Sequence, residues 1–302
     1  MNNVIERRMI APNVHELVVE APEVARGAAP GQFVIVRPFE GGERIPISIS
    51  DWDRDQGTVT CVFIEVGAST MMLAGLCKGD VIPTFAGPLG RATDLSAVGP
   101  GATVVAVGGC YGIGSIFPLV RAVRQAGASV HVVIEARSSY LFYWTDKLRK
   151  VATSLNLITR DGSRGRMGHI DQLPDILRER LADKGGKPDK IYVNGCTYLM
   201  KRATEVAVGM GLGTTVNLNP LMIDGTGMCG VCRVSVGGRT RFACVDGPDF
   251  PGEEVNWKEL FLRRKAYAKE EKLGLLTVRQ NVEHPGGKCA GAGRTSDAAD
   301  RE

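Results

Sequence analysis

The hydrophobic pattern along the chain changes character near residue 100. Up to about residue 97, short runs rich in Val, Ile and Thr alternate with turns that contain Pro and Gly, as is typical of β-strands. This favours a closed antiparallel barrel over a sandwich, although periodicity alone does not separate the two. One short helix is expected at 69–77. The predicted strands are Val14–Glu20, Phe33–Val36, Ile45–Ser50 and Thr58–Ile64.

Helix and strand patterns alternate from about residue 101 to residue 219. A buried strand at Thr103–Val107 precedes a Gly-rich turn and a helical stretch that runs through Gln125. Such alternation predicts a parallel sheet with helices on both faces. Further strands are expected at 130–134, 155–159, 190–193 and 214–219, and further helices at 141–152, 171–183 and 197–209.

These patterns predict the fold class β + α/β in a chain of 302 residues, which is long enough for two domains and a small lobe. We expect an antiparallel β-barrel, a Rossmann-like α/β domain, a lobe that includes a charged helical stretch at 256–272, and a disordered tail rich in Gly, Ala and Asp. The expected boundaries are 1–97, 98–220, 221–283 and 284–302.

Composition narrows the class of protein. Hydrophobic residues make up 44% and charged residues 23%, as in globular proteins, and no apolar run has the length of a membrane span. A formal net charge of +4 is too small to argue for nucleic acid. Because nothing at the N-terminus resembles a secretory signal, we expect a cytoplasmic protein with neither membrane nor nucleic-acid partners.

Three of the eight cysteines lie in one Gly-rich stretch that suggests a metal cluster. The pattern is Asp224-x4-Cys229-x2-Cys232-x11-Cys244, the spacing of a plant-type [2Fe–2S] loop with Asp at the first ligand position. Small residues between the ligands let the backbone approach the cluster closely. A carboxylate is a harder ligand than a thiolate, so it should alter the reduction potential.

Two other readings of this loop stay open. C-x2-C is also zinc-ligand spacing, but zinc favours four Cys or mixed Cys and His sets, and no His lies between residues 170 and 283. A disulfide among these cysteines is disfavoured by the absence of an export signal. Cys289, in the tail, is expected to be a spectator.

A Gly-rich turn follows the strand at Thr103–Val107 and opens a helix, where a pyrophosphate could meet a helix N-terminus. It is not a strict G-x-G-x-x-G, and packing alone could require the same glycines. The candidate nucleotide-binding residues of this turn are Gly108, Gly109, Gly112 and Gly114.

Two further strand ends add candidates. Glu135 and Arg137 end the next strand, where ribose-contacting residues lie in dinucleotide folds. Glu135 favours a free ribose hydroxyl and Arg137 a 2′-phosphate, so NADP(H) remains an alternative to NAD(H). Gly195 and Cys196 end another strand and could lie near a nicotinamide, although a lone Cys is more often a small buried residue.

The order of motifs resembles a known superfamily. Glu43–Pro46, Gly87–Gly90, Asp224–Arg233 and Ala243–Phe250 together are similar to the ferredoxin-reductase superfamily, in the branch of dihydroorotate dehydrogenase electron-transfer subunits. Within it the chain resembles the small subunits of NADH-dependent reduced ferredoxin:NADP oxidoreductases, also known as sulfide dehydrogenase small subunits. Relatives usually have Cys where this chain has Asp224, and small residues where it has Cys110 and Tyr111.

The resemblance implies FAD binding by the barrel. Arg44 would pair with the flavin pyrophosphate, and Pro46, Ile47 and Ser48 would form the strand beside the isoalloxazine. Gly67, Ser69 and Thr70 would hold phosphate at the start of the short helix.

The resemblance also implies a function. The chain would pass electrons between NAD(H), FAD and the [2Fe–2S] cluster, as the NADH-linked arm of an electron-bifurcating oxidoreductase, with no catalytic acid or base of its own. Its partner would be a larger flavin and iron–sulfur subunit that binds NADP(H), with ferredoxin reached through the complex. The alternatives are a sulfide or polysulfide oxidoreductase with the same small chain and, from another class, a structural subunit without a redox centre.

Overall fold

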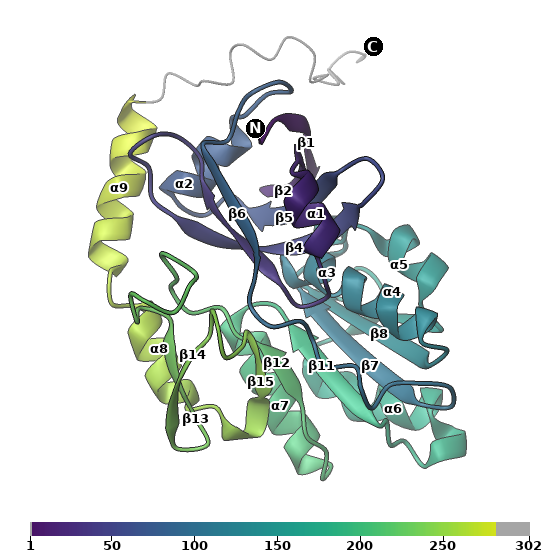
Figure 1. The fold of residues 1–302 in the computed structure, drawn as a ribbon. Helices are drawn as coiled ribbons and strands as arrows, with labels where there is room; N and C mark the ends of the chain where they lie inside the picture. Colours follow the sequence, from purple (N-terminus) through teal and green to yellow (C-terminus); the bar gives the residue numbers. More distant parts are fainter. Residues whose placement is uncertain (1, 282–302) are drawn as a thin grey trace, which may run out of the picture.

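The computed structural model describes the backbone of residues 2–281 and the side chains of residues 2–278. The tail at 284–302, with Cys289, lies outside the described residues. Figure 1 shows an N-terminal antiparallel sheet above a central sheet flanked by helices, with a smaller C-terminal part beside both. The predicted β + α/β fold class is therefore confirmed, while the domain boundaries at 97, 220 and 283 stay predictions.

The N-terminal sheet has six strands in the order β1-β2-β5-β4-β3-β6. Its two ends approach each other, because Asn3 forms a β-bridge with Val81 and the Val4 amide donates to the Asp80 carbonyl at 2.8 Å. The sheet thus curls into a barrel. The strands are β1 (Val4–Ala11), β2 (Val14–Glu20), β3 (Phe33–Arg37), β4 (Ile45–Asp53), β5 (Thr58–Ile64) and β6 (Thr84–Leu89); the helices are α1 (Pro22–Gly27) and α2 (Ala68–Ala74).

The four predicted strands of this region are confirmed, and β2 and β5 have the expected bounds. The pattern missed β1, β6 and α1. Residues 4–11 escape detection because three charged residues, Glu6, Arg7 and Arg8, interrupt the apolar run, and half of the strand is exposed, as is usual for an outer strand. The helix predicted at 69–77 is shorter, since Gly75 already ends it.

The central sheet has seven strands in the order β10-β9-β8-β7-β11-β12-β15, and only β15 runs antiparallel to its neighbour. The strands are β7 (Thr103–Gly109), β8 (Ser129–Ala136), β9 (Ser154–Thr159), β10 (Arg166–Met167), β11 (Lys190–Asn194), β12 (Thr215–Asn217) and β15 (Asp249–Pro251). The helices are α3 (Gly112–Ser115), α4 (Phe117–Gln125), α5 (Thr145–Val151), α6 (Leu173–Arg180) and α7 (Thr197–Gly209), with short 3-10 turns η1 (Ser139–Leu141), η2 (Ile170–Gln172) and η3 (Ala182–Lys184).

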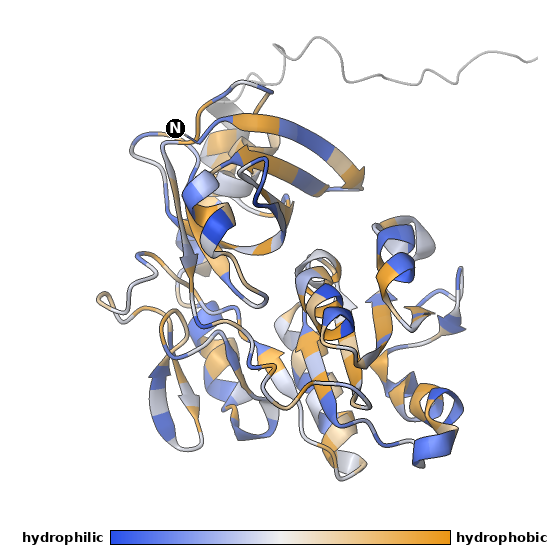
Figure 2. Cartoon of the chain, turned by 45° about the vertical axis from the view of Figure 1, so that its right-hand side comes forward, coloured by the Kyte–Doolittle hydropathy of each residue, from blue (hydrophilic) through white to orange (hydrophobic). Residues whose placement is uncertain are grey.

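Every residue of β7 is buried, because helices cover both faces of the sheet. Val104 and Ala106 pack with α3, α4 and α5, whereas Val105 and Val107 pack with α6 and α7. Figure 2 shows hydrophobic residues concentrated on these strands. Among the described residues, no helix combines the length and the apolar character that a membrane crossing requires.

Two predicted helices of this region begin later than expected. The helix predicted at 141–152 begins at Thr145, because Trp144 has a left-handed backbone (φ 54°) that breaks the helical path. The helix predicted at 171–183 narrows to Leu173–Arg180 between two 3-10 turns. The helix at 197–209 has the predicted bounds.

The C-terminal part combines a hairpin with two helices. The hairpin strands are β13 (Arg233–Val236) and β14 (Arg239–Phe242), followed by η4 (Gly252–Glu254), α8 (Trp257–Arg264) and α9 (Ala268–Asn281). The charged stretch predicted as one helix at 256–272 is thus two helices. Helix α9 lies against α2 of the barrel (Figure 1).

Charged and aromatic side chains fix the barrel on the central domain. Asp51 of β4 accepts from Arg121 of α4 at 2.5 Å and from Lys147 of α5 at 2.6 Å. The Trp144 indole donates to Glu16 of β2 at 2.7 Å. Since these contacts join residues at least 70 positions apart, they are tertiary and could not be read from local patterns.

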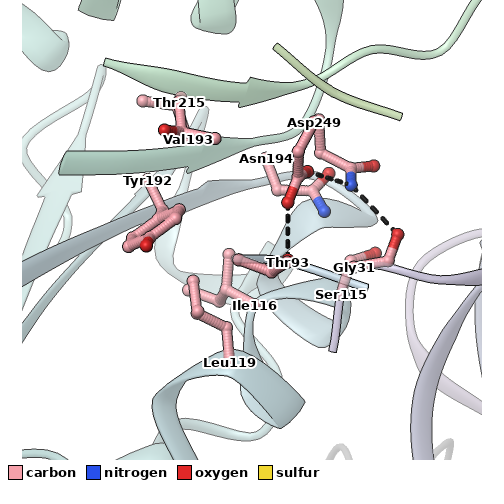
Figure 3. Close-up of a pocket in the computed structure, with 11 residues that line it drawn as sticks. Gly31, Thr93, Ser115, Ile116, Leu119, Tyr192, Val193, Asn194, Thr215 and Asp249 are labelled. Carbon is pink, nitrogen blue, oxygen red and sulfur yellow. Dashed lines mark hydrogen bonds between the residues drawn. The ribbon is translucent and has the colours of Figure 1, made fainter. Parts of the chain in front are cut away.

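A second junction centres on Asp249 in β15. Its carboxyl group accepts from the Thr93 hydroxyl at 2.5 Å and from the Asn217 amide at 2.6 Å, and that amide also donates to the Gly31 carbonyl at 3.1 Å (Figure 3). The junction therefore ties three parts to the central sheet: the barrel, the C-terminal part, and the segment between β6 and β7 (residues 90–102), called the linker below. A cavity of about 20 Å³ beside it also holds the unpartnered Asn194 amide oxygen, and this volume suits one water molecule.

Asp249 should make stability depend on pH. Burial raises its pKa from 3.8 to about 6, so in this window the folded protein holds a proton that the unfolded chain releases. This contribution to stability is full below pH 3.8 and is lost as the pH rises through 6. In the wild-type protein this carboxyl group should lower the unfolding free energy by roughly 2 kcal/mol between pH 4 and 7. Asp249→Asn should lack this decrease when the unfolding free energy is measured by denaturant titration at each pH.

The matched control is Asp55→Asn, at an exposed position in the β4–β5 turn, which should keep the wild-type pH dependence. An unchanged slope in Asp249→Asn would show that the carboxyl group is not the source.

Candidate functional site

The hairpin of β13 and β14 brings two cysteines together. Arg233 pairs with Phe242, so Cys232 and Cys244 flank the open end of the hairpin. Their sulfur atoms lie 3.2 Å apart, and both side chains are buried. Burial and the neighbouring thiol raise the pKa of Cys244 to about 12. A buried thiol pair of this kind needs a bound cation to become thiolate, which is what an iron site supplies.

Asp224 organises the loop that precedes this hairpin. Its carboxylate accepts from the Thr226 amide at 3.0 Å and from the Cys229 amide at 2.9 Å. These two N–H donors hold the pKa of Asp224 below its ordinary value, so the carboxylate is ionised and available as a ligand. Gly227 brings the loop close to the thiol pair, since a Cβ there would lie 3.0 Å from Cγ2 of Val245, the neighbour of Cys244.

The four predicted ligands therefore share one lobe, arranged as two pairs: Cys232 with Cys244, and Asp224 with Cys229. In a [2Fe–2S] cluster each iron takes two protein ligands, so two pairs fit the group. Within residues 2–281, no three His, Cys, Asp or Glu side chains converge as they would around a single ion. Cys229, Cys232 and Cys244 are free thiols.

Gly225 presses this loop against the barrel. Its φ is +77°, and a Cβ there would lie 2.6 Å from Leu89 Cδ1 of β6 and 2.8 Å from Ile35 Cγ1 of β3. Only glycine satisfies both the backbone conformation and the close approach. Ile35 also pairs with Pro46 of β4 in the neighbouring strand. The loop at 224–232, called the cluster loop below, therefore packs on β3, the immediate neighbour of the predicted flavin strand.

The predicted flavin residues lie at one end of the barrel. Pro46, Ile47 and Ser48 belong to β4, with Ile47 buried and its neighbours half-buried. Arg44 precedes the strand and is exposed; in the described part of the chain, no carboxylate lies within ion-pair distance of it. An uncompensated guanidinium at this position fits a diphosphate.

The start of α2 has fewer free donors than expected. Thr70 Oγ1 accepts from the Val66 and Gly67 amides, at 3.0 and 2.9 Å, and donates to the Gly67 carbonyl. The Ser69 hydroxyl donates to Glu43 at 2.8 Å. Gly67 caps the helix with open space beside its Cα, which leaves room for a ligand.

The Gly-rich turn after β7 is shaped as much by packing as by any ligand. A Cβ at Gly112 would lie 2.1 Å from the Asn194 carbonyl oxygen, one at Gly108 2.8 Å from Ile116, and one at Gly109 2.5 Å from Leu199. The Gly114 amide donates to the Tyr143 hydroxyl at 3.0 Å, and that hydroxyl donates to the Cys110 carbonyl at 2.9 Å. The predicted roles of these four glycines in nucleotide binding stay predictions.

Asn219 and Arg264, which the sequence motifs did not identify, also lie at the carboxyl edge of the sheet. The Tyr111 hydroxyl donates to the Gly195 carbonyl at 2.6 Å, and Asn219 donates to the same two groups. Arg264 of α8 donates to Asn219 Oδ1 at 2.9 Å. Asn219 could have been found, because it follows a strand of the sheet; Arg264 gave no local signal.

Glu135 and Arg137 end β8 with different surroundings. Glu135 is buried, accepts from the Ile170 amide at 2.8 Å, and lies 3.6 Å from Arg160 and 3.4 Å from His169. Its carboxylate is thus already engaged by the protein. Arg137 is exposed at the edge of the sheet. Cys196 is the N-cap residue of α7, without a side-chain capping hydrogen bond, and the Cys110 thiol lowers its pKa.

Comparison with known proteins agrees with this geometry. A family model of the iron–sulfur cluster binding domain of dihydroorotate dehydrogenase B matches residues 219–256, which include all four predicted ligands. The chain is 38% identical over 274 residues to a dihydroorotate dehydrogenase B (NAD(+)) electron transfer subunit homolog of Thermotoga maritima, covering 90% of this chain and 94% of the relative. It is 30% identical over 257 residues to the electron transfer subunit of Desulforamulus reducens, covering 83% and 95%.

A solved structure extends the likeness to the whole fold. A chain of the NADH-dependent reduced ferredoxin-NADP oxidoreductase, studied for flavin-based electron bifurcation, superposes with a TM-score of 0.83 and 35% identity. The match covers 92% of this chain and 97% of that one.

Replacing Asp224 tests the ligand set. Asp224→Ala should lower iron per chain and weaken the visible and EPR signals, because one iron loses its oxygen ligand. Asp224→Cys should retain the iron with a changed EPR signal and potential. Met228→Ala, at an exposed neighbour in the same loop, is the control and should keep wild-type iron. Wild-type iron and spectrum in Asp224→Ala would contradict the assignment.

Gly225→Ala separates packing from ligation. It should destabilise the lobe and lower iron content although all four ligands remain, because its Cβ meets Leu89 and Ile35. Gly238→Ala has a similar φ (+72°) but nothing within 4 Å, so it should cost only about 1 kcal/mol and keep its iron. Iron and sulfide analysis with thermal unfolding compares the pair; equal iron in both would show that the contact is unimportant.

Proposed function

The chain belongs to the family of dihydroorotate dehydrogenase B electron transfer subunits and their homologues, and we propose that it passes electrons between NAD(H), FAD and a [2Fe–2S] cluster as the NADH-linked arm of a larger complex. The likeness to the NADH-dependent reduced ferredoxin-NADP oxidoreductase supports this assignment over other branches of the family. No catalytic acid or base is required of the protein, because the chemistry belongs to the cofactors.

The position of β3 is the observation that carries the proposal. Its residue Ile35 packs against Gly225 of the cluster loop through its side chain and pairs with Pro46 of the flavin strand through its backbone. Two sites that exchange electrons must lie close together, and the distance between them must stay fixed. A single strand that contacts both the cluster loop and the flavin strand meets that requirement.

A bound FAD would supply the conversion between two-electron hydride transfer with NADH and single-electron transfer with the cluster. The residues of the chain would bind and orient. Arg44 would form a bidentate ion pair with the flavin diphosphate. Ile47 and Ser48 of β4 would lie beside the isoalloxazine ring. Gly67, Ser69 and Thr70 would contact phosphate at the start of α2, provided that Ser69 exchanges its bond with Glu43.

The carboxyl edge of the central sheet would receive NAD(H). Gly108, Gly109, Gly112 and Gly114 would form the turn beneath the pyrophosphate, and Gly195 and Cys196 would lie beside the nicotinamide. Because Glu135 is engaged by Ile170, Arg160 and His169, its role with ribose would require a change of partners. Arg137 is free to contact the ribose or a 2′-phosphate, which keeps NADP(H) open as the alternative coenzyme.

Asp224, Cys229, Cys232 and Cys244 would ligate the cluster. The partner would be a larger subunit that carries a second flavin and further iron–sulfur clusters and binds NADP(H), with ferredoxin as a substrate of the whole complex. We place the protein in the reducing cytoplasm, where exposed thiols such as Cys229 persist.

Anaerobically purified full-length chain tests the proposal. We expect about one FAD, two irons and two sulfides per chain, and NADH should bleach the flavin and cluster absorbance. Arg44→Ala should lose most of its FAD and its NADH response, because the diphosphate loses its cation, whereas Arg26→Ala, at an exposed Arg in α1, should keep both. A colourless protein with zinc or no metal would refute the electron-transfer function; activity with polysulfide but not with NADP and ferredoxin in the native complex would redirect the assignment of the acceptor.

A further inference from the structure

Cys110 and Cys196 lie next to each other at the carboxyl edge of the central sheet. The parallel pairing of β7 and β11 ends at Gly108 and Asn194, and each cysteine follows two residues later. The intervening glycines stay in contact: a Cβ on Gly195 would lie 2.8 Å from the Gly109 carbonyl oxygen. Neighbouring parallel strands are about 4.8 Å apart, and disulfides need Cα atoms about 4.4–6.8 Å apart. The register therefore places these cysteines at bridging distance.

The two positions are held by their surroundings. The Tyr111 hydroxyl, next to Cys110, donates to the carbonyl of Gly195, next to Cys196, at 2.6 Å. Tyr143 fixes the Cys110 carbonyl at 2.9 Å. Cys110 also has a left-handed backbone (φ 55°), one of three such non-glycine residues within residues 2–281. Such strain at a loop residue persists only where neighbouring contacts impose it.

The chemistry of the pair is asymmetric. Cys196 caps the 13-residue helix α7. The Cys110 thiol and the Leu199 and Tyr198 amides lower the pKa of Cys196 to about 6, against the opposing effect of burial. The same contact raises the pKa of Cys110, which stays protonated. Cys110 is exposed and Cys196 half-buried, so a small molecule can reach the thiolate.

We propose that Cys110 and Cys196 form a reversible dithiol–disulfide site that reacts with low-molecular-weight disulfides and, when oxidised, closes the nicotinamide end of the nucleotide site. The Cys196 thiolate attacks one sulfur of the small disulfide, which forms a mixed disulfide and releases one thiolate. The Cys110 sulfur then attacks the mixed disulfide, loses its proton and releases the second thiolate. The two protein thiols give up two electrons and the small disulfide is reduced to two thiols.

The consequence for nucleotide binding follows from position. A bridge would tie the Gly-rich turn to the end of β11 and occupy the edge where the nicotinamide is expected. This part of the inference depends on the proposed function, whereas formation of the bridge does not.

Oxidised glutathione is the probe. The full-length holoprotein is treated anaerobically at pH 7, free thiols are alkylated, and peptides are mapped by mass. We expect a Cys110–Cys196 linked peptide, reversed by dithiothreitol, and a fall of at least tenfold in NADH oxidation with a dye acceptor. Cys61, which is buried and whose pKa burial raises to about 12, is the internal control and should stay reduced.

The variants Cys110→Ser and Cys196→Ser are each compared with themselves before and after treatment. Neither should yield the linked peptide, and each should lose less than twofold of its own activity. Damage to the cluster would instead inactivate wild type and variants alike. Glutathione adducts without a linked peptide, or a linked peptide with unchanged NADH oxidation, would overturn the proposal. Absence of NADH oxidation in the untreated protein would refute the proposed function and leave the peptide result to stand by itself.

Discussion

The contact of Gly225 with β3 and β6 is the constraint on which the rest of this structure depends. The cluster loop can lie against the barrel only because this residue has no side chain and accepts a left-handed backbone. Ile35, which receives the loop, is fully buried and belongs to the same core as Cys232, Cys244 and the central sheet. Phe33 and Ile35 of the barrel thus share one apolar core with the lobe and the sheet, whereas most of the barrel has a core of its own.

Polar contacts then set the angles between the parts. Strand β15, from the C-terminal part, adds to the central sheet beside β12, and its Asp249 reaches the linker through Thr93. The linker in turn hydrogen-bonds to the lobe, since the Arg91 amide donates to the Gly247 carbonyl at 2.7 Å. A lobe that contributed only packing could slide on the sheet; a strand in register cannot, because each displacement breaks its ladder of hydrogen bonds.

Local patterns predicted the elements well and their long-range contacts poorly. The strands β2 and β5 and the helix α7 have their predicted bounds. Strand β15 is three residues long and forms only by pairing with β12, so no local sequence pattern predicts it. Ligand spacing located Asp224 and the cysteines of the lobe, whereas the Tyr143 contact with the Gly-rich turn and the proximity of Cys110 and Cys196 arise only from strand register. Spacing also could not show that Gly112 is required by the nearby Asn194 carbonyl.

Asp224 has a structural role in its loop, besides any effect on the reduction potential of a bound cluster. Its two oxygens accept the amides of Thr226 and Cys229, which folds the loop into a turn before any metal is considered. A thiolate is a weaker acceptor and presents one atom where the carboxylate presents two. With Asp at this position the turn is held by these two hydrogen bonds, and Gly225 and Gly227 supply the left-handed residues that it needs. Asp224 therefore organises this loop through hydrogen bonds to two amides, which would favour a bound cluster held in one fixed position beside β3.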